Sequence, residues 1–149
     1  MPPSDPTAES LRLWVIFSRA HAAVGARAQA DVTRHGLTIA EFGVLEALHH
    51  KGPMLLSELK AKILVSNAGV TYLVDRLEKR GLVERRRCDR DRRAYYAHLT
   101  AEGTGFVARI FPEHAAAIEE AFSVLSAEER ATATALLRKV GRHAADTAS

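Results

Sequence analysis

The densest group of chemically active side chains in this sequence is a run of arginines near the middle of the chain. Nine Lys and Arg residues and four Asp and Glu residues lie between positions 76 and 93, a local charge of +5 in a chain of net charge +3. Guanidinium groups bind phosphate oxygens in a fixed two-pronged geometry. Such a basic segment on a mildly acidic remainder indicates a surface that binds nucleic acid, and the alternative is a solvated run of charges without a ligand.

A helix is predicted over residues 66–80, directly before most of the arginines. Four apolar side chains recur at the spacing of one helical face: Val70, Leu73, Val74 and Leu77. The complementary face is polar and carries Asn67, Thr71, Asp75, Arg76 and Lys79. Gly81 ends the helix, because glycine accepts the left-handed conformation that follows many helices.

Alternating residues then predict a β-hairpin, with strands on either side of a polar tip at residues 88–92. A helix followed by a hairpin with a basic tip is typical of a winged helix-turn-helix. Such a unit places one helix in the DNA major groove and a loop on the backbone or in the minor groove. We therefore expect double-stranded DNA as a partner, bound through helix 66–80 and wing 84–98.

Several polar side chains of the helix can contact DNA. The amide of Asn67 can pair with the N6 and N7 edge of adenine, or it can cap the helix without touching a base. Ser66 and Thr71 are short donors suited to phosphate or base edges. Arg76 can reach phosphate or guanine. The alternative is that Arg76 contacts no DNA and only interacts weakly on the helix surface, with Arg80 four residues later or with the surroundings of Glu78.

The sequence contains no motif that indicates an enzyme or a metal-binding protein. The chain has no Gly-rich phosphate loop, nucleophile elbow or Walker-type lysine. Its seven histidines do not form a set with zinc-ligand spacing, although Asp31 and His35 are four residues apart. We expect neither an enzyme, nor a metal site, nor a cofactor.

Elements that position the polar helix are predicted on both sides of it. A long helix with excess apolar surface spans residues 8–34, Thr38 and Glu41 form a capping box, and Ser57 caps a brief helix over 58–64. A helix over 101–122 should bend at Pro112, and Ser126 opens a last helix with a second capping box. The expected divisions are a disordered lead (1–8), a dimerisation helix (9–36), a winged DNA-binding domain (37–100) and C-terminal dimerisation helices (101–145).

The expected fold class is therefore mainly α with a small β-hairpin wing, a winged helix-turn-helix flanked by N- and C-terminal dimerisation helices. The longest uncharged stretch, residues 63–74, is too short for the roughly 20 residues that span a bilayer, so no membrane contact is expected. The proline-rich start lacks the apolar core of a signal peptide. The single cysteine, Cys88, excludes an intrachain disulfide and fits a reducing cytoplasm.

Two motifs closely resemble the MarR family (multiple antibiotic resistance regulators) of bacterial transcription factors. The first runs from Leu73 to Val83, and the second is Asp91-Arg92-Arg93, separated by five residues from Leu99-Thr100. The resemblance extends over residues 9–143. It implies a homodimer held by the first and last helices, with each subunit on half of a palindromic operator. It also implies repression that a small molecule relieves, or oxidation in some members.

The same resemblance assigns roles in the wing. It makes Arg93 the side chain that enters the groove or contacts the backbone, and Asp91 the group that braces it by a charge-assisted hydrogen bond. Further phosphate contacts are expected from Arg86, Arg90 and Arg92. Structural ion pairing without DNA contact is the alternative.

Regulation is the remaining expectation from the family. Neighbouring arginines could make Cys88 oxidisable, but the family's peroxide sensors carry their cysteine in the first helix, so we favour a passive thiol. The effector pocket of relatives lies between the dimer helices and the winged unit. Four residues could line it or could equally belong to core and dimer packing: Trp14, Phe17, His21 and Phe111. The segment 67–75 is most similar to relatives that respond to phenolic or quinone compounds, which favours an aromatic or lipophilic effector.

Two functions from different classes follow. The leading one is a dimeric, sequence-specific DNA-binding repressor that a small effector releases. The alternative is a winged-helix module that binds protein rather than DNA, favoured by the modest net charge and the apolar first helix.

Overall fold

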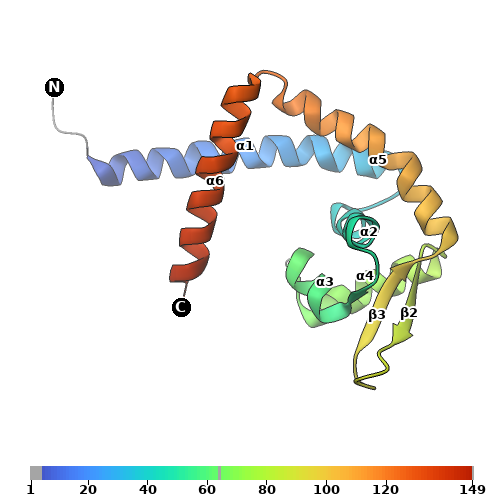
Figure 1. Ribbon diagram of the computed structural model, residues 1–149. Coiled ribbons are helices and arrows are strands. Elements are labelled where there is room, and N and C mark those ends of the chain that lie inside the picture. The colour runs from blue at the N-terminus through green and yellow to red at the C-terminus, as the bar shows by residue number, and fades with distance from the viewer. Residues whose placement is uncertain (1–4, 64, 149) are drawn as a thin grey trace.

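The computed structural model describes residues 5–63 and 65–148 and consists mainly of helices. Along the chain the elements are α1 (Pro6–Arg34), α2 (Ile39–Lys51), β1 (Met54–Leu55), α3 (Leu56–Ile63), α4 (Asn67–Lys79), β2 (Val83–Arg87), β3 (Tyr95–Leu99), α5 (Ala101–Phe122) and α6 (Ala127–Thr147). Figure 1 shows α1 as a long rod with α5 along part of it, while α2, α3, α4 and the strands form a unit at one end. The expected fold class is confirmed.

The winged unit contains the hydrophobic core and a small antiparallel sheet. The strands lie in the order β1-β3-β2, with Val83 opposite Leu99 and Arg87 opposite Tyr95. The four apolar residues predicted to form the buried face of α4 are its buried residues. They pack with Leu45 of α2, Leu59 of α3 and Val107 of α5. The core therefore holds α4 and the hairpin in one rigid arrangement.

Local hydrogen bonds define several helix starts. At α2, the Thr38 hydroxyl accepts from the Glu41 amide at 3.1 Å, and the Glu41 carboxylate accepts from the Thr38 amide at 3.2 Å. The same reciprocal pair forms between Ser126 and Glu129 at α6. Both predicted capping boxes are confirmed.

Two predicted boundaries differ, and a third falls outside the described residues. α1 begins at Pro6, before the predicted residue 8, because the Asp5 carboxylate caps it by accepting from the Thr7 amide at 3.0 Å. α3 begins at Leu56, directly after β1 pairs with β3, so the expected cap by Ser57 is wrong. The expected last residue of that helix, 64, lies outside the described residues.

Pro112 lies inside α5, which continues through it. Proline removes one backbone donor and crowds the preceding turn, which kinks a helix. Figure 1 shows α5 turning along its length, as the sequence predicts. The turn lets one helix follow α1 and also reach the base of the wing.

The two terminal helices expose unusual amounts of apolar surface. No residue of α6 within the described range is buried, and α1 buries only Ala28, Asp31 and Val32. The large exposed apolar side chains on these helices are Leu11, Leu13, Trp14, Val15, Ile16, Phe17, Leu136, Leu137 and Val140. None of the described helices is both long enough and apolar enough to cross a membrane.

Candidate nucleic-acid interface

The start of α4 leaves Asn67 available for contacts outside the chain. Ser66, not Asn67, is the cap: its hydroxyl oxygen accepts from the Gly69 amide at 3.0 Å. Asn67 is exposed, and no hydrogen bond among the described residues uses its side-chain amide. The cap interpretation of Asn67 is therefore wrong. The Thr71 hydroxyl donates to the Asn67 carbonyl at 3.1 Å, which leaves its oxygen as an acceptor.

Arg76 is held by groups that the sequence did not suggest. One of its guanidinium nitrogens donates to the Tyr72 hydroxyl oxygen at 3.3 Å, and the guanidinium carbon lies 5.7 Å from the centre of the Tyr72 ring. Its Nε also lies 3.7 Å from a carboxylate oxygen of Glu41 on α2. The hydrogen bond to Tyr72, with the negative charge of Glu41, raises the pKa of Arg76 above its usual value. The alternative interpretation, in which Arg76 pairs near Glu78 or Arg80, is therefore wrong.

Arg85 forms ion pairs with both acidic side chains of α4. Its guanidinium lies 2.8 Å from the Asp75 carboxylate and 3.0 Å from the Glu78 carboxylate. This contact joins the base of the wing to the polar helix. It also offsets part of the negative charge that Asp75 and Glu78 place on α4.

The wing tip is built from backbone hydrogen bonds. The Arg93 amide donates to the Asp91 carboxylate at 3.0 Å, and the Ala94 amide donates to the Asp91 carbonyl at 3.0 Å. The Cys88 amide closes the turn by donating to the Ala94 carbonyl at 2.8 Å. Asp91 therefore braces the backbone at Arg93, and the expected brace on its guanidinium is wrong.

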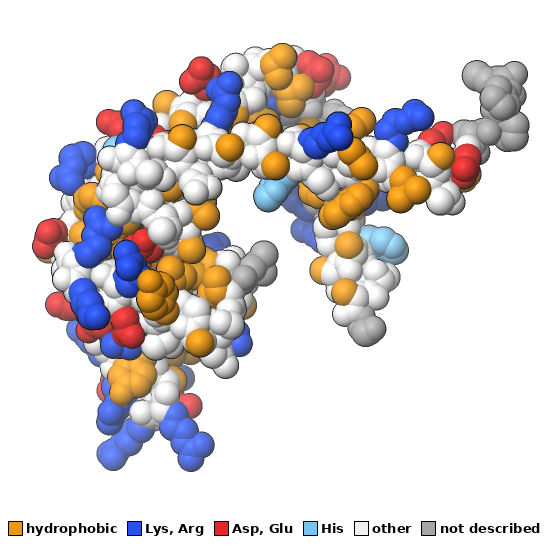
Figure 2. Space-filling view, turned by 180° about the vertical axis from the view of Figure 1, so that it is seen from behind, with side chains coloured by type: hydrophobic (Ala, Val, Ile, Leu, Met, Phe, Trp, Pro, Cys, Tyr) orange, Lys and Arg blue, Asp and Glu red, His pale blue; other side chains and the backbone are white. Residues whose placement is uncertain are grey.

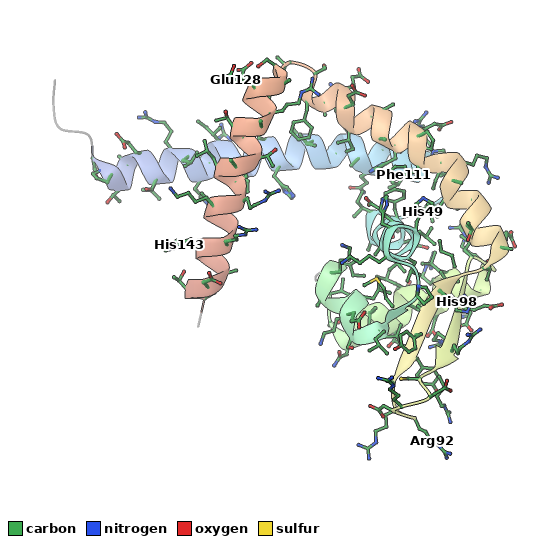
Figure 3. All side chains as sticks on the ribbon, in the orientation of Figure 1. His49, Arg92, His98, Phe111, Glu128 and His143 are labelled. Atoms are coloured by element: carbon green, nitrogen blue, oxygen red, sulfur yellow. The ribbon has the colours of Figure 1, made fainter. Side chains whose placement is uncertain are left out.

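The guanidinium groups of the tip point away from the protein. Within residues 5–63 and 65–148, no carboxylate lies within ion-pair distance of the arginines expected to bind phosphate: Arg86, Arg90, Arg92 and Arg93. All four residues are exposed. Figure 2 shows Lys and Arg side chains gathered at the far end of the wing, and Figure 3 shows Arg92 extending from that end. The geometry suits contact with a polyanion.

Two residues of this surface were missed by sequence reasoning. Tyr72 is 59% exposed at the middle of α4, beside Thr71 and opposite the buried face. Arg87 donates to the Tyr95 hydroxyl at 3.1 Å and lies over that ring, so it is held along the wing. The helical spacing that identified the buried face could have found Tyr72, because position 72 lies on the opposite side.

Cys88 lies at the end of β2 and is only 9% exposed. Burial limits the access of oxidants to a thiol. The passive thiol stays our prediction.

A histidine and carboxylate cluster joins α1 to α5. The Asp31 carboxylate accepts from Arg34 at 2.6 Å and lies 3.1 Å from Nδ1 of His114, while Nε2 of His35 lies 3.2 Å from the Glu113 carboxylate. Burial acts to raise the pKa of Asp31, but the hydrogen bonds and charges of Arg34 and His114 outweigh it and lower the pKa. Atoms of Asp31, His35 and Glu113 lie within 4.8 Å of one another, as metal ligands do. Both Asp31 oxygens are already occupied, so we assign the cluster to helix packing.

The candidate effector residues do not meet within one chain. Phe111 lines a groove of about 530 Å³ between α5 and α6, which Glu46 of α2 also borders. Figure 3 shows Phe111 close to His49, with ring centres 6.1 Å apart. Trp14 and Phe17 lie together on exposed α1, with ring centres 6.3 Å apart. Neither these two nor His21 lines the groove, so the four-residue pocket stays a prediction.

Comparison with known proteins agrees with this geometry. Residues 35–94 match the model of the MarR family. The chain is 41% identical over 138 residues to the HTH-type transcriptional regulator MhqR of Bacillus subtilis (strain 168), covering 93% of this chain and 95% of MhqR.

Two solved structures extend the comparison. Sco3205 of Streptomyces coelicolor, a MarR family transcriptional regulator in complex with DNA, superposes with a TM-score of 0.86 at 27% identity and covers 95% of this chain and 91% of that one. BpsR of Bordetella bronchiseptica, whose DNA binding is regulated by 6-hydroxynicotinic acid, has a TM-score of 0.79 at 28% identity, covering 87% and 98%. These relatives are DNA-binding regulators and not enzymes. The winged unit, its arginine-tipped hairpin and these similarities together show that the chain belongs to the MarR family of transcriptional regulators.

Proposed function

We propose that the protein is a homodimeric transcriptional repressor that binds a palindromic operator and is released by a small aromatic or lipophilic effector. The observation that carries the proposal is the combination of an exposed Asn67 amide, free of the capping role at the start of α4, with four wing arginines that have no carboxylate partner among the described residues. In this arrangement α4 enters the major groove, and the wing contacts the backbone or minor groove.

The terminal helices supply the surface for dimerisation. Burying one large apolar side chain contributes about 1.5–3 kcal/mol, and α1 alone exposes six of them between Leu11 and Phe17. A second copy of the chain covers this surface in a two-fold arrangement. The symmetry then duplicates the winged unit, and half-sites about one helical turn (roughly 34 Å) apart fit its two copies.

The groove between α5 and α6 is our candidate for the effector site. Its volume of about 530 Å³ falls in the usual range for small-molecule pockets. Its walls are mainly apolar, with Phe111, Ile118 and Phe122, and its polar groups include Arg130 and His114. The regulation of BpsR by an aromatic acid supports the same ligand class. Since the groove borders α6, a ligand there can shift the two winged units relative to each other.

Selection of bound fragments from random double-stranded DNA tests the proposal. The purified protein should enrich one palindrome, and its affinity for that palindrome should fall steeply with salt because neutralised phosphates release counterions. A protein-interaction module would enrich no sequence. Enrichment of a single, unrepeated half-site would contradict the dimeric arrangement.

Release by an effector is tested on the selected palindrome. A panel of aromatic acids, phenols and quinones should contain compounds that dissociate the complex in a gel shift. Substitution of Phe111 by Ala should weaken their effect while leaving DNA affinity in their absence unchanged. A reporter gene behind the palindrome should be silent with the protein and active with the effector, and the opposite response would make the protein an activator.

A further inference from the structure

Tyr72 lies at the centre of the exposed face of α4 and does not belong to the hydrophobic core of the described residues. The residue is 59% exposed, although a tyrosine is commonly at least partly buried. The neighbouring residue one turn earlier, Ala68, is exposed and small, and Asp75 is paired with Arg85 at 2.8 Å. The outer side of the ring is therefore open, and no acidic group competes for its hydroxyl among the described contacts.

The orientation of Tyr72 is set from within the protein. Arg76 donates a hydrogen bond to its hydroxyl oxygen at 3.3 Å and lies beside its ring. Arg76 is in turn attracted to Glu41, whose side chain is 2% exposed and whose other carboxylate oxygen accepts from the Thr38 amide. A side chain held in this way loses less conformational entropy when it binds a partner.

We propose that Tyr72 is a specificity-determining residue that reads a T·A base pair in each half-site, and that Arg76 is its positioning residue. The inference rests on the proposed DNA-binding function of α4. Because the phenol oxygen accepts from Arg76, its own O–H is left to donate outward. In the major groove thymine presents an O4 acceptor next to the C5 methyl group. A phenol ring with a free O–H donor matches both features, whereas cytosine offers a donor and no methyl group.

The test compares the wild-type protein with Tyr72→Ala and Tyr72→Phe by selection from random DNA and by competition binding to single-base-pair variants. In the wild type, replacing one symmetric T·A pair by C·G should cost about tenfold in affinity. Tyr72→Ala should remove that preference, and Tyr72→Phe should keep part of it through the ring. Replacing the thymine by uracil, which deletes only the methyl group, should weaken wild-type binding and leave Tyr72→Ala unaffected.

Arg76→Gln separates positioning from phosphate contact. Arg76→Gln should reduce the preference for T·A over C·G at the base pair that Tyr72 contacts, and at no other base pair. In a double variant with Tyr72→Ala, it should not reduce that preference any further. An equal loss of affinity for every sequence would make Arg76 a phosphate contact and overturn its positioning role. Val124→Ala, at an 86% exposed position between α5 and α6 and outside α4 and the wing, is the control and should leave all preferences unchanged. Thermal unfolding should be the same for the Tyr72 variants, because Tyr72 is exposed. Arg76→Gln should unfold at a somewhat lower temperature, because it removes the positive charge beside the buried Glu41 carboxylate.

Two outcomes distinguish the failure of this inference from the failure of the proposed function. If the wild type selects a palindrome and Tyr72→Ala selects it with unchanged preferences at every position, the role of Tyr72 is overturned and the repressor function stands. If the wild type selects no sequence, the proposed function fails and this inference fails with it.

Discussion

The arginines near α4 and the wing differ in whether they already have a partner within the protein. Arg76 and Arg85 are tied to Glu41, Asp75 and other groups of the fold, whereas Arg93 projects from a turn whose backbone Asp91 holds. An arginine that already has an internal partner gives up that interaction when it binds phosphate. Free phosphate contacts should therefore concentrate in the wing tip.

Removal of the Arg93 side chain should weaken operator binding. We expect Arg93→Ala to cost about 1–3 kcal/mol in binding free energy and to reduce the slope of affinity against salt by about one ion. A gel-shift titration at several salt concentrations measures both quantities. Arg142→Ala, on exposed α6, removes the same charge far from the wing and is the control. An affinity for Arg93→Ala equal to that of this control would remove the role assigned to the wing tip.

Asp31 should make stability depend on acid pH. Its pKa is lowered in the folded protein, so the unfolded chain binds the proton more readily, and the free energy of unfolding falls as the pH drops below about 4. Asp31→Asn should abolish this part of the dependence and destabilise the protein by about 1.5–3 kcal/mol at pH 7. Urea unfolding between pH 3 and 7 measures it, with exposed Asp146→Asn as control. Parallel pH curves for wild type and Asp31→Asn would refute the assignment.

The junction between the wing and α5 depends on close backbone packing. The Thr100 hydroxyl donates to the Gly81 carbonyl at 2.6 Å and also accepts from the Gly103 amide at 3.0 Å. At Gly103 a Cβ atom would overlap the carbonyl of Leu82, which itself accepts from the Thr100 amide. Glycine at this position allows α5 to begin directly beneath the hairpin.

Two glycines of the same helix should respond oppositely to alanine. Gly103→Ala must displace the Leu82 backbone and should destabilise the protein by about 1–3 kcal/mol or more. Gly105→Ala meets nothing within 4 Å and should be neutral or stabilising by up to about 1 kcal/mol. Urea unfolding monitored by circular dichroism compares the two variants. Equal stabilities would show that α5 can shift away from β2 at no cost.

The terminal helices support the proposed dimer. The core lies mainly in the winged unit, whereas the N-terminal half of α1 and the outer surface of α6 leave apolar side chains in solvent. The residues predicted to bind the effector do not lie together in one chain. Trp14, Phe17 and His21 lie on α1, away from the groove that Phe111 lines. In the proposed dimer, a second subunit would cover this surface and complete the pocket.

A charge placed on α1 should separate the subunits. Ile16 is 58% exposed, and Ile16→Glu should weaken dimerisation at least tenfold, because burial of an unpaired carboxylate is costly. Analytical ultracentrifugation measures the change, and operator affinity should fall with it. Ile39→Glu is the matched control, since Ile39 is 45% exposed at the start of α2. A dimer that persists in Ile16→Glu and dissociates in Ile39→Glu would move the interface away from α1.

Features that depend on near neighbours in the chain were predictable. The apolar spacing of α4 identified its buried face, the Thr38 and Ser126 capping boxes identified two helix starts, and the arginine-rich segment identified the wing. Helical periodicity, caps and turns arise from interactions between residues a few positions apart, so a short segment of sequence is enough to predict them.

The partners of individual charged groups were not predictable. Arg76 faces Glu41 of another helix, Asp31 meets His114 of α5, and Asp91 bonds to a backbone amide where a guanidinium was expected. Side-chain pairing across elements depends on packing distances and helix angles that no short segment contains. Sequence therefore defined the helix and the hairpin that we propose to contact DNA. Only the tertiary structure decided which arginines remain free to bind phosphate, because folding alone brings distant carboxylates within reach of the other arginines.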